Sequence, residues 1–273
     1  MPSPSRYVLT GATSGIGAAV ADALARRHHA LVLVGRSREV LDARGAALRQ
    51  LGAPAVSLHE ADLSSVAQTL ALAGDLASEP VDGVYLGAGI LRLERQVTAE
   101  DLELNYAVNH LHKFILADAL GPHLAPRGGR IVVGAPVGAV RGRLDDVHGT
   151  GSWSLFQGIS TSQYANDVLA SGLPGRHPGL EVVGWNPGST RGTRVTRGLP
   201  WWARTLFWLV NLRGRACAEV GEQGADLMTG PAGRPLTWVS KRDTVSLARA
   251  DELSADVDVL WDLDAAIIDR IRR

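Results

Sequence analysis

The stretch Thr10-Gly11-Ala12-Thr13-Ser14-Gly15-Ile16-Gly17 decides the fold. It follows the apolar run Tyr7-Val8-Leu9 and opens an Ala-rich segment, so we expect a strand, a tight turn and a helix. Gly11 permits the turn, Gly15 lets the backbone approach a pyrophosphate, and Gly17 lets helix and strand pack closely. The first N–H groups of the helix are then free to bind phosphate. This pattern predicts a dinucleotide site with contacts from Gly11, Thr13, Ser14, Gly15, Ile16 and Gly17.

Length, charge and cysteine content exclude several classes of protein. The chain has 273 residues, with 28 basic and 28 acidic side chains, which predicts one domain over residues 1–273 and argues against nucleic acid as a partner. Cys217 is the single cysteine and suits a reducing compartment. The N-terminal residues lack the apolar run of a signal peptide, and the longest apolar stretch, Leu206 to Val210, is too short to span a bilayer. We therefore expect a cytoplasmic protein.

Further apolar runs typical of strands alternate with helical segments. They are Ala30–Val34, Ala55–His59, Val81–Leu86, Gly129–Pro136, Glu181–Trp185 and Leu236–Val239. Continuous apolar runs are typical of strands buried on both faces of a parallel sheet. Helices are expected between them, including a long one from about Ala99 to Leu120. Without a linker or repeat, this alternation predicts a single doubly wound α/β domain.

The residues after the second and third strands indicate which dinucleotide binds. In dinucleotide folds an acid near the end of the second strand holds the ribose 2′-OH of NAD, whereas an arginine accommodates the 2′-phosphate of NADP. Here Arg36 occupies that place and no acid does, which favours NADP(H). Asp62-Leu63 follows the third strand at the ligand edge. Asp62 is expected to contact the cofactor or to be the N-cap of the next helix, and the two roles are compatible.

The fourth strand and the long helix supply the next candidates. Gly87-Ala88-Gly89 leaves room for a nucleotide to pass close to the backbone. Asn109 lies within the helix, which suggests a specific hydrogen-bonding role. His110 and His112 are two residues apart and lie on different helix faces, so they do not form a metal pair and are expected as surface or partly buried side chains. No metal site is predicted.

Residues 189–215 differ in composition from the rest of the chain. No acid lies between Glu181 and Glu219, and six arginines alternate with large aromatic residues. They are Arg191, Arg194, Arg197, Arg204, Arg213 and Arg215, with Trp201, Trp202, Phe207 and Trp208. The segment could be a lid over an apolar substrate, an amphipathic helix packed on the domain, or a patch that touches an anionic membrane. Its place after the sixth strand favours the lid.

With these motifs in view, nearly the whole chain resembles the short-chain dehydrogenase/reductase superfamily. The resemblance rests on the glycine turn, Asp62-Leu63, Gly87-Ala88-Gly89, Asn109 and Pro187-Gly188. The branch of retinol dehydrogenases and protochlorophyllide reductases is most similar, through Val108–Leu111, Ser162–Asn166 and Leu260–Asp262. The resemblance implies a Rossmann fold with a seven-stranded parallel sheet and helices on both faces. It also implies NADP(H) across the sheet's C-terminal edge, contacted by Ala88, Gly89, Pro187 and Gly188, and Asn109 helping to hold a proton-relay water.

The resemblance also implies a catalytic serine, tyrosine and lysine, and here the sequence departs from it. The serine position falls on Pro136, the tyrosine on Ile159 and the lysine on Gln163. The two lysines of the chain, Lys113 and Lys241, are not preceded by a tyrosine four residues earlier. A positioned acid is worth typically about 10²–10⁴ in rate. We therefore do not expect an ordinary alcohol dehydrogenase.

Three functions remain open. The protein could reduce a conjugated or otherwise activated apolar intermediate of bacterial specialised metabolism. It could instead be a cyclase or isomerase, with NADP(H) absent or structural, or a sensor or scaffold without catalysis. Candidate catalytic residues are Asn109, Gln163 and His148, the last in the loop from Arg143 to Trp153, with Ser160, Ser162 and Tyr164 as other donors. Candidate apolar contacts are Pro136, Trp153 and Ile159. The expected partner is an apolar small molecule, and a homodimer stays open.

Overall fold

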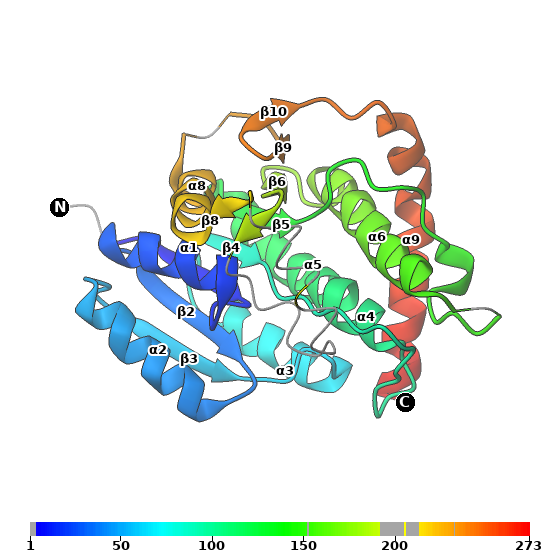
Figure 1. Cartoon of the computed structure of the whole chain (residues 1–273), viewed down its shortest axis with the longest axis horizontal. Coiled ribbons are helices and arrows are strands. Elements are labelled where there is room, and N and C mark those ends of the chain that lie inside the picture. Colours follow the sequence, from blue (N-terminus) through cyan, green and yellow to red (C-terminus); the bar gives the residue numbers. More distant parts are fainter. Residues whose placement is uncertain (1–3, 152, 192–204, 206–212, 232) are drawn as a thin grey trace.

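A twisted sheet of eight strands forms the centre of the protein (Figure 1). The structure is a computed structural model that describes residues 4–151, 153–191, 205, 213–231 and 233–273. The strand order is β10-β9-β6-β5-β4-β1-β2-β3. The strands are β1 (Arg6–Thr10), β2 (Ala30–Gly35), β3 (Val56–Glu60), β4 (Gly83–Leu86), β5 (Arg130–Gly134), β6 (Glu181–Asn186), β9 (Leu236–Ser240) and β10 (Asp243–Val245). The predicted doubly wound fold is confirmed.

The expected number of seven strands is wrong by one. β10 pairs antiparallel with β9, from Asp243 opposite Ser240 to Val245 opposite Trp238. All other pairs in this sheet are parallel. The eighth strand has three residues and follows a tight turn in which Lys241 has a φ of +57°. A segment this short and polar carries no apolar run, so its pairing could not be predicted from the sequence pattern.

Helices cover both faces of the sheet. One face carries α1 (Gly15–Arg26), α2 (Arg38–Gln50) and α8 (Cys217–Thr229). The other carries α3 (Val66–Ala77), α5 (His112–Leu124) and α6 (Leu155–Arg176). The final helix, α9 (Ala250–Arg272), lies alongside α6 (Figure 1). The structure therefore has three layers, with α9 as an additional cover over the α5–α6 side.

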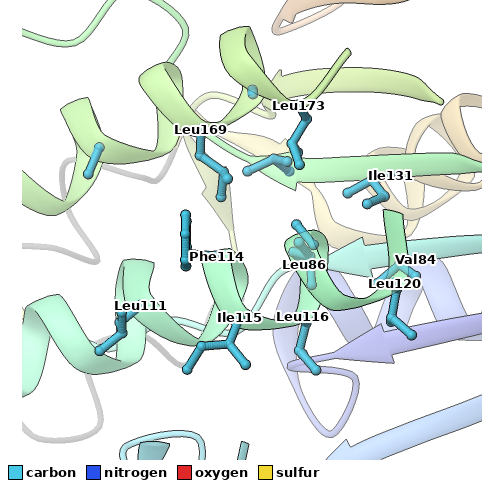
Figure 2. Packing of buried hydrophobic residues seen from close by; sticks show 14 of the residues in the cluster. Val84, Leu86, Leu111, Phe114, Ile115, Leu116, Leu120, Ile131, Leu169 and Leu173 are labelled. Atoms are coloured by element: carbon cyan, nitrogen blue, oxygen red, sulfur yellow. The ribbon is translucent and has the colours of Figure 1, made fainter. Parts of the chain in front are cut away.

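The core has two parts, one on each side of the sheet. Successive residues of β1 alternate between them, since Val8 belongs to the α3–α5–α6 side and Leu9 to the α1–α2–α8 side. Both side chains are fully buried. Figure 2 shows the larger part, where Phe114 of α5 lies between this helix and Leu169 of α6. Burying a large apolar side chain contributes roughly 1.5–3 kcal/mol, so these two layers account for much of the stability.

The expected long helix begins later than predicted and changes type. It starts with α4 (Leu104–Tyr106), continues as a π-helix (Ala107–Leu111, η1) and ends as α5. The residues before it form a turn in which Thr98 N–H donates to the Leu102 carbonyl, so the helix cannot start at Ala99. A π-bulge is rare and frequently marks a functional site. Asn109 lies within it.

Short elements complete the described structure. They are the 3₁₀ turns η2 (Ala125–Arg127) and η3 (Leu144–Asp146) and the parallel pair β7 (Thr190–Arg191) and β8 (Arg215–Ala216). The β7–β8 pair holds the two ends of the Arg/Trp-rich segment together. Most of the predicted lid, residues 192–204 and 206–212, lies outside the described residues. Within the described part, no helix is both long and apolar enough to cross a membrane.

Candidate functional site

The candidate site lies at the C-terminal ends of β1 and β4, where the strand order reverses. Open α/β sheets bind ligands at such switch points. Thr10, the last residue of β1, joins the two strands: its Oγ1 accepts hydrogen bonds from the N–H groups of Gly87 and Ala88, at 3.1 and 3.2 Å. The glycine turn after β1 and the loop after β4 are therefore held against each other.

Two glycines of the turn occupy places where a side chain would collide with backbone. Gly11 has a φ of +74°, and a Cβ on it would lie 2.8 Å from the amide nitrogen of Ala88. A Cβ on Gly17 would lie 2.4 Å from the carbonyl oxygen of Gly11. The close packing of the first helix against this turn, predicted from the motif, therefore depends on glycine at both positions.

The N-terminus of α1 is open, unlike those of the two helices that follow it. The N-cap residue Ser14 makes no side-chain hydrogen bond to the first turn. By contrast, Ser37 Oγ accepts from Val40 N–H at α2. At α3, Ser65 Oγ accepts from Gln68 N–H, and the Glu100 carboxylate accepts from the N–H of Val66. An uncapped first turn with glycines packed beneath it fits a pyrophosphate, because its free N–H groups and the helix dipole attract an anion.

Arg36 and Asp62 stand at the ends of β2 and β3. Arg36 is exposed and forms no hydrogen bond or ion pair with any residue that the structure describes, whereas its neighbour Arg38 pairs with Asp42. Asp62 Oδ1 accepts from the N–H and hydroxyl groups of Ser64. The prediction of Asp62 as the helix N-cap is wrong, because α3 begins later and Ser65 caps it.

Asn109 uses its side chain to hold the loop after β4. Its Oδ1 accepts from Ile90 N–H at 2.7 Å, and its Nδ2 donates to the Ile90 carbonyl at 3.1 Å. Gly89 lies against the same amide, since a Cβ on it would be 3.2 Å from Asn109 Oδ1. The specific hydrogen-bonding role predicted for Asn109 is thus to fix the backbone of Gly89 and Ile90.

The main-chain carbonyl of Asn109 is the end of a buried hydrogen-bond chain. It accepts from Asn166 Nδ2 at 2.9 Å, and Asn166 Oδ1 faces His110 Nδ1 at 3.1 Å. His110 Nε2 lies 2.7 Å from Asp264 Oδ2, and the Tyr106 hydroxyl donates to Asp264 Oδ1 at 2.7 Å. This chain connects α9, through α4, η1 and α6, to Asn109, the residue that by resemblance would help to hold a proton-relay water.

The donors and acceptors in this chain fix its proton content. A carbonyl can only accept, so Asn166 must turn its NH₂ toward Asn109 and its oxygen toward His110. The Nδ1 atom of His110 must then carry a proton. The contact between Nε2 and Asp264 needs a second proton, either on the imidazole or on the carboxyl. His110 and Asp264 are therefore joined by a single hydrogen bond inside the core.

The expectation that His110 and His112 are surface or partly buried side chains is wrong. Their exposed fractions are 0% and 1%. The physical reason is that η1 and the first turn of α5 lie between the sheet, α3 and α6, so both histidines are covered. Burial holds the pKa of His112 well below its ordinary value. The residues that cover these histidines or bond to them come from distant segments of the chain. The local sequence therefore gives no sign that the two side chains are buried.

The loop after β5 is held in an unusual conformation. Val137 follows Pro136 and has a φ of +58°, which is rare for a β-branched residue. The buried carboxylate of Asp167 accepts from the N–H groups of Val137, Gly138 and Ala139, at 2.9–3.1 Å. Burial raises the pKa of Asp167, and these three donors oppose that shift. Strained backbone held by its surroundings is typical of functional sites.

Pro136 is also tied to the loop after β6. Asn186 Nδ2 donates to the Pro136 carbonyl at 2.6 Å, and Asn186 Oδ1 accepts from Gly188 N–H at 2.9 Å. Gly188, next to Pro187, has a φ of +73°, a conformation that favours glycine. The C-terminal ends of β5 and β6 are thereby joined, as Thr10 joins those of β1 and β4.

The candidate residues on α6 and in the loop before it do not all point the same way. Ile159 is half-buried and Gln163, one helical turn later, is exposed. Tyr164 points away from them, as expected: its hydroxyl donates to Asp256 of α9 at 2.5 Å, and burial followed by this bond raises its pKa. Trp153 packs on Gly158 and Gly149 beside the start of α6.

His148 lies against the start of α4. Its Nδ1 is 3.5 Å from Glu103 N–H, its ring lies edge-on to Tyr106, and its carbonyl accepts from Arg95. Burial lowers the pKa of His148. None of these contacts is with Pro136, Ile159 or Gln163, so its catalytic role stays a prediction.

Lys113, set aside from the sequence because no tyrosine precedes it by four residues, lies at the site. It lies one turn after Asn109 and is 5% exposed, and its Nζ donates to the Gly134 carbonyl at the end of β5. Its spacing of four from Asn109 was the available indication, since residues four apart share a helix face. Among the described residues, no cluster of potential metal ligands is present.

Comparison with known proteins agrees with this geometry. The short chain dehydrogenase family matches residues 6–145. A Streptomyces sp. (strain C5) protein provisionally named daunorubicin C-13 ketoreductase DnrU is 32% identical, covering 97% of this chain and 93% of its own length. Dehydrogenase/reductase SDR family member 13 from Bos taurus is 31% identical, covering 92% and 76%. A short-chain dehydrogenase from Sphingobium yanoikuyae, solved in complex with NADPH, superposes with a TM-score of 0.64 at 26% identity, covering 94% and 95%.

The family match covers more than half of the chain, and DnrU extends the similarity over nearly all of it. The chain therefore belongs to the short chain dehydrogenase family.

Proposed function

We propose that this member of the short chain dehydrogenase family is an NADP(H)-dependent reductase of an activated, apolar small molecule. The observation that carries the proposal is the open N-terminus of α1, packed on Gly11 and Gly17. Side chains cap the first turns of α2 and α3, whereas that of α1 has no side-chain cap. The free N–H groups of α1 at the switch point can therefore bind an anion. Arg36, exposed and unpaired in the described structure, supports a site for the 2′-phosphate, because it follows β2.

The relatives support the cofactor and the chemical setting. The similar dehydrogenase from Sphingobium yanoikuyae was solved with NADPH, and the Streptomyces relative bears the name of a ketoreductase. Both favour reduction over oxidation and a role in bacterial specialised metabolism. The single cysteine and balanced charge keep the cytoplasm as the proposed compartment.

Bound NADPH would supply a hydride to the substrate. Around it, Asn109 fixes the backbone of Ile90 after β4, while Asp167 and Asn186 fix the loop that contains Pro136. Pro136 and Ile159 would exclude water from the substrate side. Gln163 would donate a hydrogen bond to a polar atom of the substrate, which an amide can do without acting as an acid.

These residues favour a conjugated double bond as the group that is reduced. A simple ketone needs a strong donor at its oxygen, and Pro136 and Ile159 can provide none. In a conjugated system the negative charge is spread over several atoms, so an amide donor such as Gln163 suffices. We therefore propose a conjugated enone or related activated group in an apolar molecule as the substrate.

The cofactor is tested by calorimetric titration of nucleotide-free protein with NADPH and NADH. We expect NADPH to bind more tightly, and Arg36→Ala to weaken NADPH binding about 10- to 100-fold, because charge-assisted hydrogen bonds are worth about 1.5–3 kcal/mol. NADH binding should change little. Arg38→Ala is the matched control, since Arg38 is an equally exposed arginine already paired with Asp42. Equal losses in both variants, or no nucleotide binding by the wild type, would contradict the proposal.

The reaction is tested with a cyclic α,β-unsaturated ketone and the saturated ketone of the same ring, each with NADPH. We expect NADPH consumption with the first and little with the second. A non-redox cyclase or isomerase is the second candidate, favoured by the apolar residues at 136 and 159. If the protein is a cyclase or isomerase, NADPH should bind tightly and should not be consumed with either ketone.

A further inference from the structure

The side chains of Asn109 and Lys113 lie one helical turn apart and reach the same edge of the sheet. Asn109 binds the backbone of Ile90, four residues beyond the end of β4. Lys113 Nζ donates to the Gly134 carbonyl, the last of β5, at 2.8 Å. A Cβ on Gly134 would lie 3.2 Å from the Leu86 carbonyl and 3.6 Å from this Nζ. The amine therefore lies at the C-terminal ends of β4 and β5.

No carboxylate compensates the charge of this amine among the described residues. Lys113 has one hydrogen bond, to a neutral carbonyl, and burial alone lowers its pKa to about 7. On its own helix, His112 is neutral, because burial and then Lys113 and His110 hold its pKa well below the ordinary value. On α6, Asp167 is occupied by three backbone N–H groups. The facing residues of β4 and β5, Leu86 to Gly87 and Gly134, carry no charge.

The position of Lys113 relative to a bound dinucleotide follows from the sheet. The open helix N-terminus after β1 and Arg36 after β2 place the pyrophosphate and the phosphorylated adenosine over the β1–β3 half. The other nucleotide, which carries the nicotinamide, would then lie over the C-terminal ends of β4 to β6. Lys113 Nζ lies at the ends of β4 and β5 and would be close to that half, in low-dielectric surroundings where a nearby charge acts strongly.

We propose that Lys113 is a proton-binding site coupled to the redox state of the nicotinamide, so that the protein releases a proton with the oxidised cofactor and retains it with the reduced one. The inference rests on the proposed NADP(H) function. The nicotinamide ring of NADP⁺ is cationic and that of NADPH is neutral, so only the oxidised ring repels an ammonium group below it. A like charge nearby favours the neutral amine.

The direction of this coupling suits a reductase. Reduction of a C=C or C=O bond by NADPH consumes one proton overall. A lysine that is protonated in the NADPH complex and deprotonated in the NADP⁺ complex holds that proton before turnover. It regains the proton from solvent after NADP⁺ leaves. Lys113 would thereby hold a positive charge near the nicotinamide. The lysine that the family resemblance expects is replaced in this chain by Gln163.

The test compares proton uptake for NADP⁺ and NADPH by calorimetry at about pH 7, in buffers of different ionisation enthalpy. The two nucleotides share their phosphates, so the difference between them isolates the ring. For the wild type we expect NADP⁺ to release up to about half a proton more than NADPH, because a group with a pKa near the working pH is half protonated. In Lys113→Met this difference should vanish while both nucleotides still bind.

Two further variants sharpen the result. Lys113→Arg keeps a permanent charge, so it should abolish the differential proton release and weaken NADP⁺ relative to NADPH. Lys241→Met removes the other lysine and should leave the differential release as in the wild type. An equal proton count for the two nucleotides, or a difference that persists in Lys113→Met, would overturn the proposal. If neither nucleotide binds, the titration shows no binding heat. That result would contradict the proposed NADP(H) function and not only the role of Lys113.

Discussion

The two halves of the candidate site are built by opposite means. Over β1–β3, the chain brings a ligand close by leaving side chains out, at Gly11 and Gly17. Over β4–β6, each loop is held by a buried or half-buried polar side chain: Asn109 after β4, Asp167 after β5 and Asn186 after β6. The first half depends on steric space, which is encoded locally. The second depends on hydrogen bonds between distant segments.

Because the second half depends on buried hydrogen bonds, we expect the largest loss of stability from a substitution far from the glycine turn. Asp264→Ala removes the carboxylate shared by His110 and Tyr106 and leaves both groups buried without their partner. We expect a loss of about 3–5 kcal/mol in the free energy of unfolding, as is typical when one partner of a buried pair is removed. Asp262→Ala, on the exposed face of the same helix, should stay within about 0.5 kcal/mol. Denaturant unfolding compares the two, and equal losses would show that the buried chain contributes nothing specific.

A change in the glycine half should affect binding more than folding. Gly17→Ala places a Cβ where the Gly11 carbonyl now lies, so the turn must move. We expect NADPH affinity to fall by at least about 100-fold, while stability falls by about 1–3 kcal/mol. Gly74→Ala is the control, because a Cβ there has nothing within 4 Å and alanine favours the helix. Titration and thermal unfolding are both needed, and unchanged affinity in Gly17→Ala would remove the steric interpretation.

The smallest expected effect tests strain in the polar half. Val137→Gly relieves a φ of +58°, which costs an L-residue about 1–2 kcal/mol, but it also increases the freedom of the unfolded chain. We expect a net gain of up to about 1 kcal/mol in the free energy of unfolding. The same change at Val140, whose φ is not positive, should destabilise or be neutral. A loss of stability in Val137→Gly would mean that Asp167 holds this loop without strain.

The sequence predicted the glycine half more completely than the polar half for the same physical reason. Steric rules apply within a few residues, so the turn after β1 and the doubly wound order could be derived from local patterns. The positions of Pro136, Ile159 and Gln163 came from family resemblance, and their roles stay predictions. The hydrogen bond between His110 and Asp264 could not be foreseen, because the two residues are 154 positions apart in the sequence. Lys113 was set aside because it lacks the tyrosine four residues earlier, and its burial could not be read locally, since lysines are mostly exposed.

That separation in sequence has a kinetic consequence. The bonds that Asp264 makes to Tyr106 and His110 close loops of 158 and 154 residues, among the longest in the chain. Contacts between such distant residues are slow to form, because the chain loses loop entropy before the contact stabilises it. We therefore expect the pairing of β1, β2 and β3 to form early in refolding and the loop held by Asn109 to settle late.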